Sequence, residues 1–135
     1  MYPLFNFKMI SIDGKIVEEK VEELYFEVPE LGLTGILANH LDYTTPLFIG
    51  ILYTVKDGVR KYYAISGGIL SFVNNTATVL ADTFESSDEL DRERIEAAKA
   101  RAEKIINEAP DSSGSDYQDA LFILKKATNR LRLLK

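Results

Sequence analysis

The chain has 135 residues, a formal net charge of −5, no cysteine, and a composition that is 46% hydrophobic and 27% charged. This is the composition of a globular protein with enough apolar residues for a core, and the lack of cysteine excludes disulfides and zinc–thiolate sites. The negative charge argues against a nucleic-acid partner, because basic patches supply most of that affinity. The first ten residues have no basic start or long apolar run, so we expect no signal peptide. The longest largely apolar run, 46–55, is too short for direct membrane insertion.

The first 84 residues are predicted to form many short β-strands. Asp13-Gly14, Asp57-Gly58 and Asn74-Asn75 each separate two runs of bulky or β-branched residues. Such pairs adopt the positive φ angles that tight hairpin turns require. Many strands joined by tight turns are typical of a sandwich or barrel. We therefore expect an all-β sandwich or flattened barrel of about ten short strands over residues 1–84.

The stretch from Gly32 to Leu47 interrupts this regular pattern. Gly32 and Gly35 permit sharp bends, and 36–38 is predicted to be a short buried strand. Asn39 tolerates a left-handed backbone, which would turn His40 toward the surface or an interface. His40 is the only histidine, and no nucleophile elbow or oxyanion loop accompanies it. We expect no catalytic residue and no metal site.

Residues 85–135 are predicted to form an antiparallel α-helical hairpin. Possible capping boxes begin at Ser86 and Ser115, with Asp88 as another possible N-cap, and the segment 110–114 should break the helix. Apolar residues at helical spacing predict an alanine-lined seam that buries little area; they are Ile95, Ala98, Ala102, Ile105 and Ala109 in the first helix, and Tyr117, Leu121, Leu124, Thr128, Leu131 and Leu134 in the second.

Charge is distributed unevenly along this hairpin. Residues 85–119 contain eleven acidic and five basic residues, a net charge of −6, whereas 120–135 contain five basic and no acidic residues. Opposite charges favour packing of the two segments against each other. The basic segment could equally bind an acidic surface on another protein.

Three motifs in order carry a resemblance to a known family. They are Gly32-x-x-Gly-Ile-Leu-x-x-His40, Gly67-Gly-Ile69 and Val79-Leu-Ala-Asp82. With this spacing the chain resembles the epsilon subunit of bacterial F-type ATP synthase, from about residue 7 to the C-terminus. The resemblance implies a non-catalytic central-stalk subunit, peripheral to the cytoplasmic face of the inner membrane.

The resemblance also implies partners. The sandwich would join the gamma subunit to the c-ring of the membrane sector, with Leu33, His40 and Leu41 at the partner interface. The helices would either fold onto the sandwich or extend toward the catalytic alpha and beta subunits, where Lys125 and Arg132 would contribute to inhibition of ATP hydrolysis. Many relatives carry an acidic residue at the position of Leu33, so the charge of that contact would differ here.

A regulatory ATP site is a further implication of the resemblance, with no cofactor otherwise required. Its residues would be Asp91, Arg94, Ile95, Arg101, Lys126 and Arg130. Ile95 replaces the alanine of ATP-binding relatives, and Lys126 stands where arginine is common. From the residues alone, Asp91 and Arg94 are equally consistent with a surface ion pair on one helix face. No Gly-rich phosphate loop is present, so we expect no hydrolysis by this chain alone.

Two other functions are compatible with the sequence. One is a free-standing β-sandwich adaptor whose helical hairpin binds a different partner. The other is a small hydrolase that uses the carboxylates of Glu18-Glu19, Glu22-Glu23 and Glu27. Alternating acidic residues on strands most often form a solvated face, however, and a glycosidase would also need a sugar-binding cleft.

Overall fold

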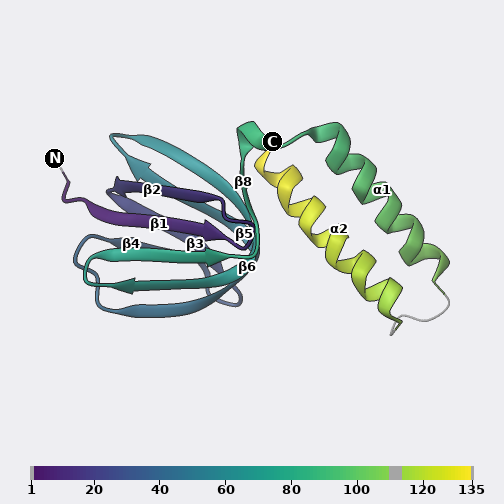
Figure 1. Ribbon diagram of the computed structural model, residues 1–135, viewed down its shortest axis with the longest axis horizontal. Helices are drawn as coiled ribbons and strands as arrows, with labels where there is room; N and C mark the ends of the chain where they lie inside the picture. The colour runs from purple at the N-terminus through teal and green to yellow at the C-terminus, as the bar shows by residue number, and fades with distance from the viewer. Residues whose placement is uncertain (1, 110–113, 135) are drawn as a thin grey trace. The chain divides into compact units, whose positions relative to one another are not determined.

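The computed structural model describes residues 2–109 and 114–134 (Figure 1). It divides into two compact units, Met1–Ser86 and Ser87–Lys135. The expected boundary after residue 84 lies two residues before this division. We describe each unit separately.

The first unit is an all-β sandwich (Figure 1). Its strands are β1 Phe5–Ser11, β2 Ile16–Val21, β3 Glu23–Val28, β4 Gly32–Leu37, β5 Tyr43–Lys56, β6 Val59–Val73, β7 Thr76–Ala81 and β8 Phe84–Ser86. In β1, residues 5, 7, 9 and 11 are buried while the residues between them are not. This period of two is that of a strand with one face on the core.

Two long strands connect the layers of the sandwich. The strand order is β2-β1-β7-β6-β5-β3-β4, with β8 also paired to β6. The first half of β5, 43–47, pairs with 68–72 of β6 next to β7, whereas β3 pairs with the second half of β5 and β8 with the first half of β6. Each long strand therefore contributes to both layers. The sandwich prediction is confirmed, with eight strands among the described residues in place of about ten, and with β2 and β4 at the two ends of an order that does not close.

The core lies between these layers. Its largest fully buried side chains are Phe5, Phe7, Phe26, Phe72, Phe84, Met9, Leu24, Ile36, Leu52, Leu70, Val21 and Val79. Phe5 and Phe72 meet edge to face with ring centroids 5.5 Å apart, a favoured aromatic geometry. Burial of each such side chain contributes about 1.5–3 kcal/mol. The sandwich therefore has a core of its own.

The turn predictions agree with the backbone angles at two of the three pairs, whereas at Asp13-Gly14 only Gly14 has a positive φ, 89°. Asp57 and Gly58 have φ values of 51° and 76°, and Asn74 and Asn75 have values of 51° and 58°. Asn39 also has a positive φ, 65°. These residue types adopt this region at low cost, and so the sequence marks these turns clearly.

Two of the family motifs lie side by side in the structure. Gly68 of β6 is opposite Ala81 of β7, and the Asp82 N–H donates to the Gly67 carbonyl oxygen at 3.0 Å. The φ of Gly68 is 137°. Only glycine combines that backbone with so close an approach to a neighbouring strand. The spacing between 67–69 and 79–82 therefore reflects one point of backbone contact.

The second unit is the predicted helical hairpin. It contains a 3₁₀ turn, Ser87–Glu89, followed by α1 Arg92–Glu108 and α2 Ser115–Leu133. Figure 1 shows the helices side by side and antiparallel. The predicted break at 110–114 lies mostly outside the described residues.

The predicted caps were wrong for both helices. Asp91 is the N-cap of α1, because the 3₁₀ turn occupies residues 87–89 and delays the start of the helix. Gly114 precedes α2 without a side-chain cap hydrogen bond, and Ser115 is already helical. A serine followed by Glu or Gln three residues later fits several registers, so this motif alone does not fix the first helical residue.

The helices pack through small side chains. The buried hydrophobic residues are Ile95 and Ala102 in α1, and Ala120 and Ala127 in α2. Ile105 and Thr128, both predicted in the seam, are exposed, and the Thr128 hydroxyl donates to the Leu124 carbonyl oxygen at 2.8 Å. Residues 120 and 127 face the partner helix because alanine permits closer approach than the bulkier residues beside it.

Candidate functional site

The proposed nucleotide residues begin at the N-terminus of α1. The Asp91 carboxylate accepts a hydrogen bond from the Arg94 backbone N–H at 3.3 Å, and the Asp91 carbonyl oxygen accepts from the Ile95 N–H at 3.0 Å. Asp91 and Arg94 are therefore linked by an N-cap, rather than by the side-chain ion pair that the sequence suggested. Both side chains are exposed.

The antiparallel pairing brings the start of α1 to the end of α2. The guanidinium of Arg92 donates through Nη2 to the Leu134 carbonyl oxygen at 3.1 Å. Arg94 and Arg130 consequently belong to the same end of the hairpin, and Lys126 lies one helical turn before Arg130. This end combines basic side chains from two helices, as an anion site requires.

The other proposed nucleotide residues differ in accessibility. Ile95 is only 8% exposed and belongs to the helix–helix seam. Arg101 is exposed and lies seven residues, or about 10 Å, beyond Arg94 along α1. The Lys126 ammonium lies 4.9 Å from the centroid of the Phe122 ring, a cation–π contact on its own helix. Of the six predicted residues, Asp91, Arg94 and Arg130 lie toward this end of the hairpin, and Ile95 is buried beside them. Lys126, eight residues before Leu134, lies farther along the hairpin, as Arg101 does.

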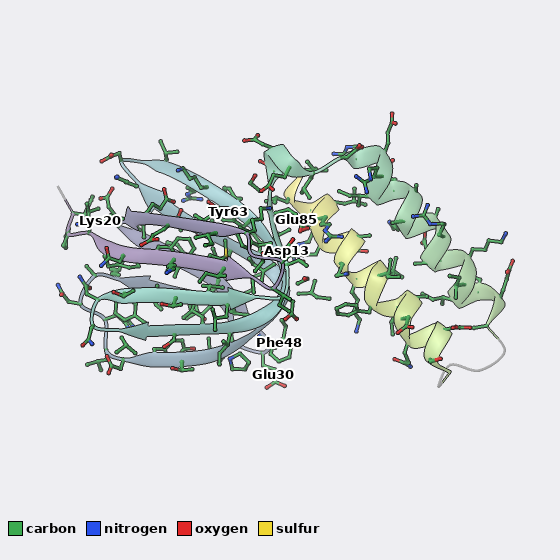
Figure 2. All side chains as sticks on the ribbon, viewed as in Figure 1. Asp13, Lys20, Glu30, Phe48, Tyr63 and Glu85 are labelled. Atoms are coloured by element: carbon green, nitrogen blue, oxygen red, sulfur yellow. The ribbon has the colours of Figure 1, made fainter. Side chains whose placement is uncertain are left out.

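The predicted interface residues of the sandwich occupy two opposite ends. Leu33 is near the start of β4, whereas His40 and Leu41 follow its end; six strand residues span about 20 Å. Figure 2 shows Glu30, just before β4, at the same end as Phe48, and Lys20 at the other end. Leu33 and Leu41 are both exposed, Leu41 to 83%. They therefore belong to two separate surfaces. On α2, Lys125 and Arg132 are also exposed.

His40 is held by its own loop. Its Nδ1 is 2.7 Å from the Leu41 carbonyl oxygen, and its ring lies edge-on to Tyr43 and Phe72 with centroids 6.1 and 5.9 Å away. The preceding residue, Asn39, donates its backbone N–H to the Asn75 side chain at 2.8 Å. These contacts fix the loop between β4 and β5 against the β6–β7 turn. His40 is therefore part of a fixed loop at this end of the sandwich.

An exposed apolar row crosses the layer formed by β2, β1, β7, the second half of β6 and the first half of β5, which we call the first layer. The sequence had not indicated this row. Neighbouring strands place five residues directly opposite one another: Ile16, Ile10, Leu80, Ile69 and Pro46. Ile16, Leu80 and Ile69 are 59%, 50% and 43% exposed. The row crosses five strands, about 19 Å at normal strand spacing. Phe48, the next outward residue of β5, is also exposed. Outward apolar positions on several strands were the available signal.

The next outward row on the same face is polar. It contains Glu18, Lys8, Thr78, Ser71 and Thr44. The apolar side chains are therefore gathered in one band and are not scattered over the sheet. A contiguous exposed apolar band marks an interaction surface.

Two negative findings concern the described residues. No group of three or more His, Cys, Asp or Glu side chains among residues 2–109 and 114–134 could hold a metal ion. Within the same ranges, neither helix has the length and apolar character needed to span a membrane.

Comparisons with known proteins agree for both units. Residues 4–87 match the beta-sandwich domain of the ATP synthase delta/epsilon chain, and residues 88–135 match its long alpha-helix domain. An ATP synthase epsilon chain from Caldicellulosiruptor bescii is 36% identical over 130 residues, covering 96% of this chain and 92% of that protein. One from Bacillus velezensis is 35% identical over 123 residues, 91% of each.

Solved structures show the same fold at lower identity. A chain of the Euglena gracilis mitochondrial ATP synthase superimposes with a TM-score of 0.83 at 21% identity, covering all of this chain and 84% of that one. A chain from the central stalk and c-ring of the Tetrahymena thermophila enzyme gives 0.60 at 9% identity, covering 99% and 98%. With both units matched in order, the chain belongs to the ATP synthase delta/epsilon family, as an epsilon subunit of an F-type ATP synthase.

Proposed function

We propose that this epsilon chain joins the gamma shaft to the membrane c-ring and restrains ATP hydrolysis through its C-terminal helices. It would have no catalytic residue of its own and would act as a peripheral subunit at the cytoplasmic face of the inner membrane. The observation that carries the docking part is the apolar row of Ile16, Ile10, Leu80, Ile69 and Pro46. An exposed band of this size needs a protein cover, and a shaft subunit would provide one.

The c-ring contact would use a different part of the sandwich. Leu31 and Leu33, around the β3–β4 turn, are both exposed. Figure 2 places Glu30, in the same turn, at the Phe48 end. These leucines would contact the loops of the c-ring through a small apolar patch. The acidic side chain that many relatives have at the Leu33 position would be missing from this contact. His40 and Leu41, at the other end of β4, would then contact gamma.

The regulatory part rests on the helical unit. Its seam contains mainly alanine side chains, which bury little apolar area each, so separation of the helices should cost less free energy than opening the sandwich core. The basic residues of α2 give that helix a charge suited to an acidic surface on the alpha or beta subunits. ATP bound by Asp91, Arg94, Lys126 and Arg130 would stabilise the paired helices and relieve inhibition by mass action.

The docking proposal is tested by placing a charge in the apolar row. Leu80→Glu should prevent co-purification of the full chain with gamma, because a carboxylate would be desolvated at the contact. Thr78→Glu is the matched control, since it lies two residues along the same strand in the polar row. Both variants must keep the circular dichroism spectrum of the natural chain. Equal capture of gamma by both would contradict the proposal and favour the free-standing adaptor.

A further inference from the structure

Three strands carry polar residues at positions that point between the layers. On β2 the inward positions are 17, 19 and 21, so Glu19 lies between two valines. Thr54 of β5 is opposite Lys61 of β6, and Lys56 is opposite Val59. Elsewhere in the sandwich such positions are filled by core residues such as Leu24 and Phe26. The interruption of the apolar pattern on three separate strands converges on one place.

That place is a pocket of about 290 Å³. It is lined by Glu19, Thr54, Lys56, Asp57, Val59 and Lys61. The volume is close to the lower end of the range for small-molecule sites. The pocket lies at the edge of the sandwich where β2 comes close to the β5–β6 hairpin without pairing to it.

Glu19 is incompletely satisfied in this pocket. Its Oε2 accepts from the Lys61 ammonium at 3.0 Å, but its Oε1 is buried and has no hydrogen-bond partner among the described residues. A buried acceptor without a partner costs about 1–3 kcal/mol, and more when charged. The side chain is therefore arranged to accept one further donor.

Asp57, another residue that lines the pocket, is held in a fixed position. The backbone N–H of Asp57 donates to the Glu22 carboxylate, and Glu22 is itself only 8% exposed. Asp57 also begins the tight turn, with a φ of 51°. The turn that carries Asp57 is thus held against the start of β3, beside the pocket.

We propose that this pocket binds the ammonium group of a small alkylamine. Three of the lining residues, Glu19, Thr54 and Asp57, have side-chain acceptors, and an ammonium group has three N–H donors to match them. Glu22 behind Asp57 adds negative charge, and Lys61 is already paired with Glu19. The Val59 side chain provides an apolar wall for the alkyl stem. All the residues of this site belong to the sandwich, and none belongs to the apolar row. The proposal is independent of the proposed function.

Two alternatives make different predictions. Inward-pointing charges on an edge strand can serve only to prevent pairing with another sheet; in that case no ligand would saturate the pocket. The ammonium of Lys56, which also lines the pocket, could instead supply the donor to Glu19. Then added amine would bind only after Lys56 is removed.

The experiment is a titration of the full chain with putrescine, followed by amide chemical shifts. We expect saturable shifts confined to residues 19–22 and 54–61, with no such shifts from 1,4-butanediol, which has the same length without charge. Glu19→Gln should weaken binding at least tenfold, while Glu18→Gln, on the outward face of the same strand, should not.

Three results would overturn the proposal. They are an unsaturable response, equal affinity in Glu19→Gln, and binding that appears only in Lys56→Met. The last result would assign the site to the chain's own lysine. Retained chemical shifts outside the pocket would show that each variant remains folded.

Discussion

A β-carbon added to Gly68 would lie 2.1 Å from the Leu80 carbonyl oxygen on the neighbouring strand. No side-chain rotation can relieve this contact, because the obstructing atom is backbone. The φ of 137° adds a second obstacle, since L-residues rarely adopt it. The structure at this point therefore requires glycine for two independent reasons.

Gly68→Ala should consequently destabilise the sandwich by about 3 kcal/mol or more. The added methyl group would push β6 away from β7, and this cost adds to the usual cost of a strained φ. Gly14→Ala is the matched control. Gly14 also has a positive φ, 89°, but nothing lies within 4 Å of its added β-carbon, so it should show only the strain, about 1–2 kcal/mol. Urea unfolding of both variants measures the difference. Equal losses would mean that β6 and β7 separate easily.

The sequence predicted the local features of the sandwich better than its long strands. Asp57-Gly58 and Asn74-Asn75 mark turns because their side chains favour the required angles. In contrast, local sequence does not show that β6 continues through Gly67 and Gly68. It is one strand of 15 residues, because these glycines bend the backbone without ending its pairing to β5.

Pro46 is a second place where local sequence does not reveal a long strand. Proline lacks the N–H of a strand ladder, yet Pro46 lies inside β5. In this half of β5 only β6 pairs with the strand, so the missing N–H of proline can face the unpaired side. The position of a strand in its layer depends on distant pairing, which local sequence does not encode. For the same reason the sequence could show outward apolar residues on single strands, but not that five strands align them in one row.

Among the nucleotide residues, the sequence could predict a shared helix end but not the accessibility of each side chain. Asp91 and Arg94 are close in sequence, and antiparallel helices bring the end of α2 to them. The helical spacing had placed Ile95 and Ala102 in the seam, and both are buried there, so Ile95 could not also be an accessible nucleotide residue. On α2 the buried alanines, 120 and 127, had not been placed in the seam.

A row of three tyrosines on β3, β5 and β6 predicts how the stability of the sandwich changes with pH. Tyr25, Tyr53 and Tyr62 lie opposite one another with successive ring centroids 4.9 Å apart. The Tyr25 hydroxyl donates to the Glu23 carboxylate, and this bond, with smaller effects of burial and charge, raises the pKa of Tyr25 above its ordinary value of 10.0. A raised pKa means that the folded chain holds the proton more tightly. This stabilisation is complete below pH 10 and is lost as the pH rises through the folded pKa.

Glu23→Gln should therefore lower the pKa of Tyr25 toward 10 and remove part of the alkaline loss of stability. Ultraviolet titration between pH 8 and 12 reports tyrosinate formation directly, and melting temperatures over the same range report the linked stability. Glu18→Gln, which is remote from Tyr25, should leave both curves unchanged. The hydrogen bond would be ruled out as the cause if Glu23→Gln and Glu18→Gln gave the same curves.

The N-cap at Asp91 predicts a difference between two substitutions. Asp91→Ala should cost about 1 kcal/mol of helix stability, whereas Asp91→Asn should cost little, because asparagine also caps helices well. Amide exchange of residues 92–96 in the full chain measures the effect. Asp88→Ala should have no such effect, since Asp88 belongs to the preceding 3₁₀ turn. Faster exchange in Asp88→Ala than in Asp91→Ala would reassign the cap.

The basic residues of α2 predict a change in the activity of the assembled enzyme. Replacing Lys126, Arg130 and Arg132 together by glutamine should raise ATP hydrolysis while leaving assembly intact, because docking would depend on the sandwich. A control replaces Lys99 and Lys104 of α1 by glutamine, and its α2 counterpart with the same loss of two charges replaces Arg130 and Arg132 alone. Hydrolysis unchanged by the α2 variant, under conditions where the natural chain inhibits, would exclude these residues from inhibition.

ATP binding to the isolated chain is the final prediction. Arg94 and Arg130 come from different helices, so a bound phosphate chain would link α1 to α2 across a seam that buries little apolar area. ATP at 100 times its dissociation constant would stabilise the paired helices by about 2.7 kcal/mol, visible as slower amide exchange throughout 92–108 and 115–133. Arg94→Ala should abolish both the heat of binding and this protection, and Lys104→Ala should retain both. Ile95→Ala is expected to loosen the seam and weaken binding, because Ile95 is buried between the helices; stronger binding in that variant would show instead that Ile95 crowds the nucleotide. Absence of heat at millimolar ATP in all three variants and the natural chain would leave Asp91 with its capping role alone.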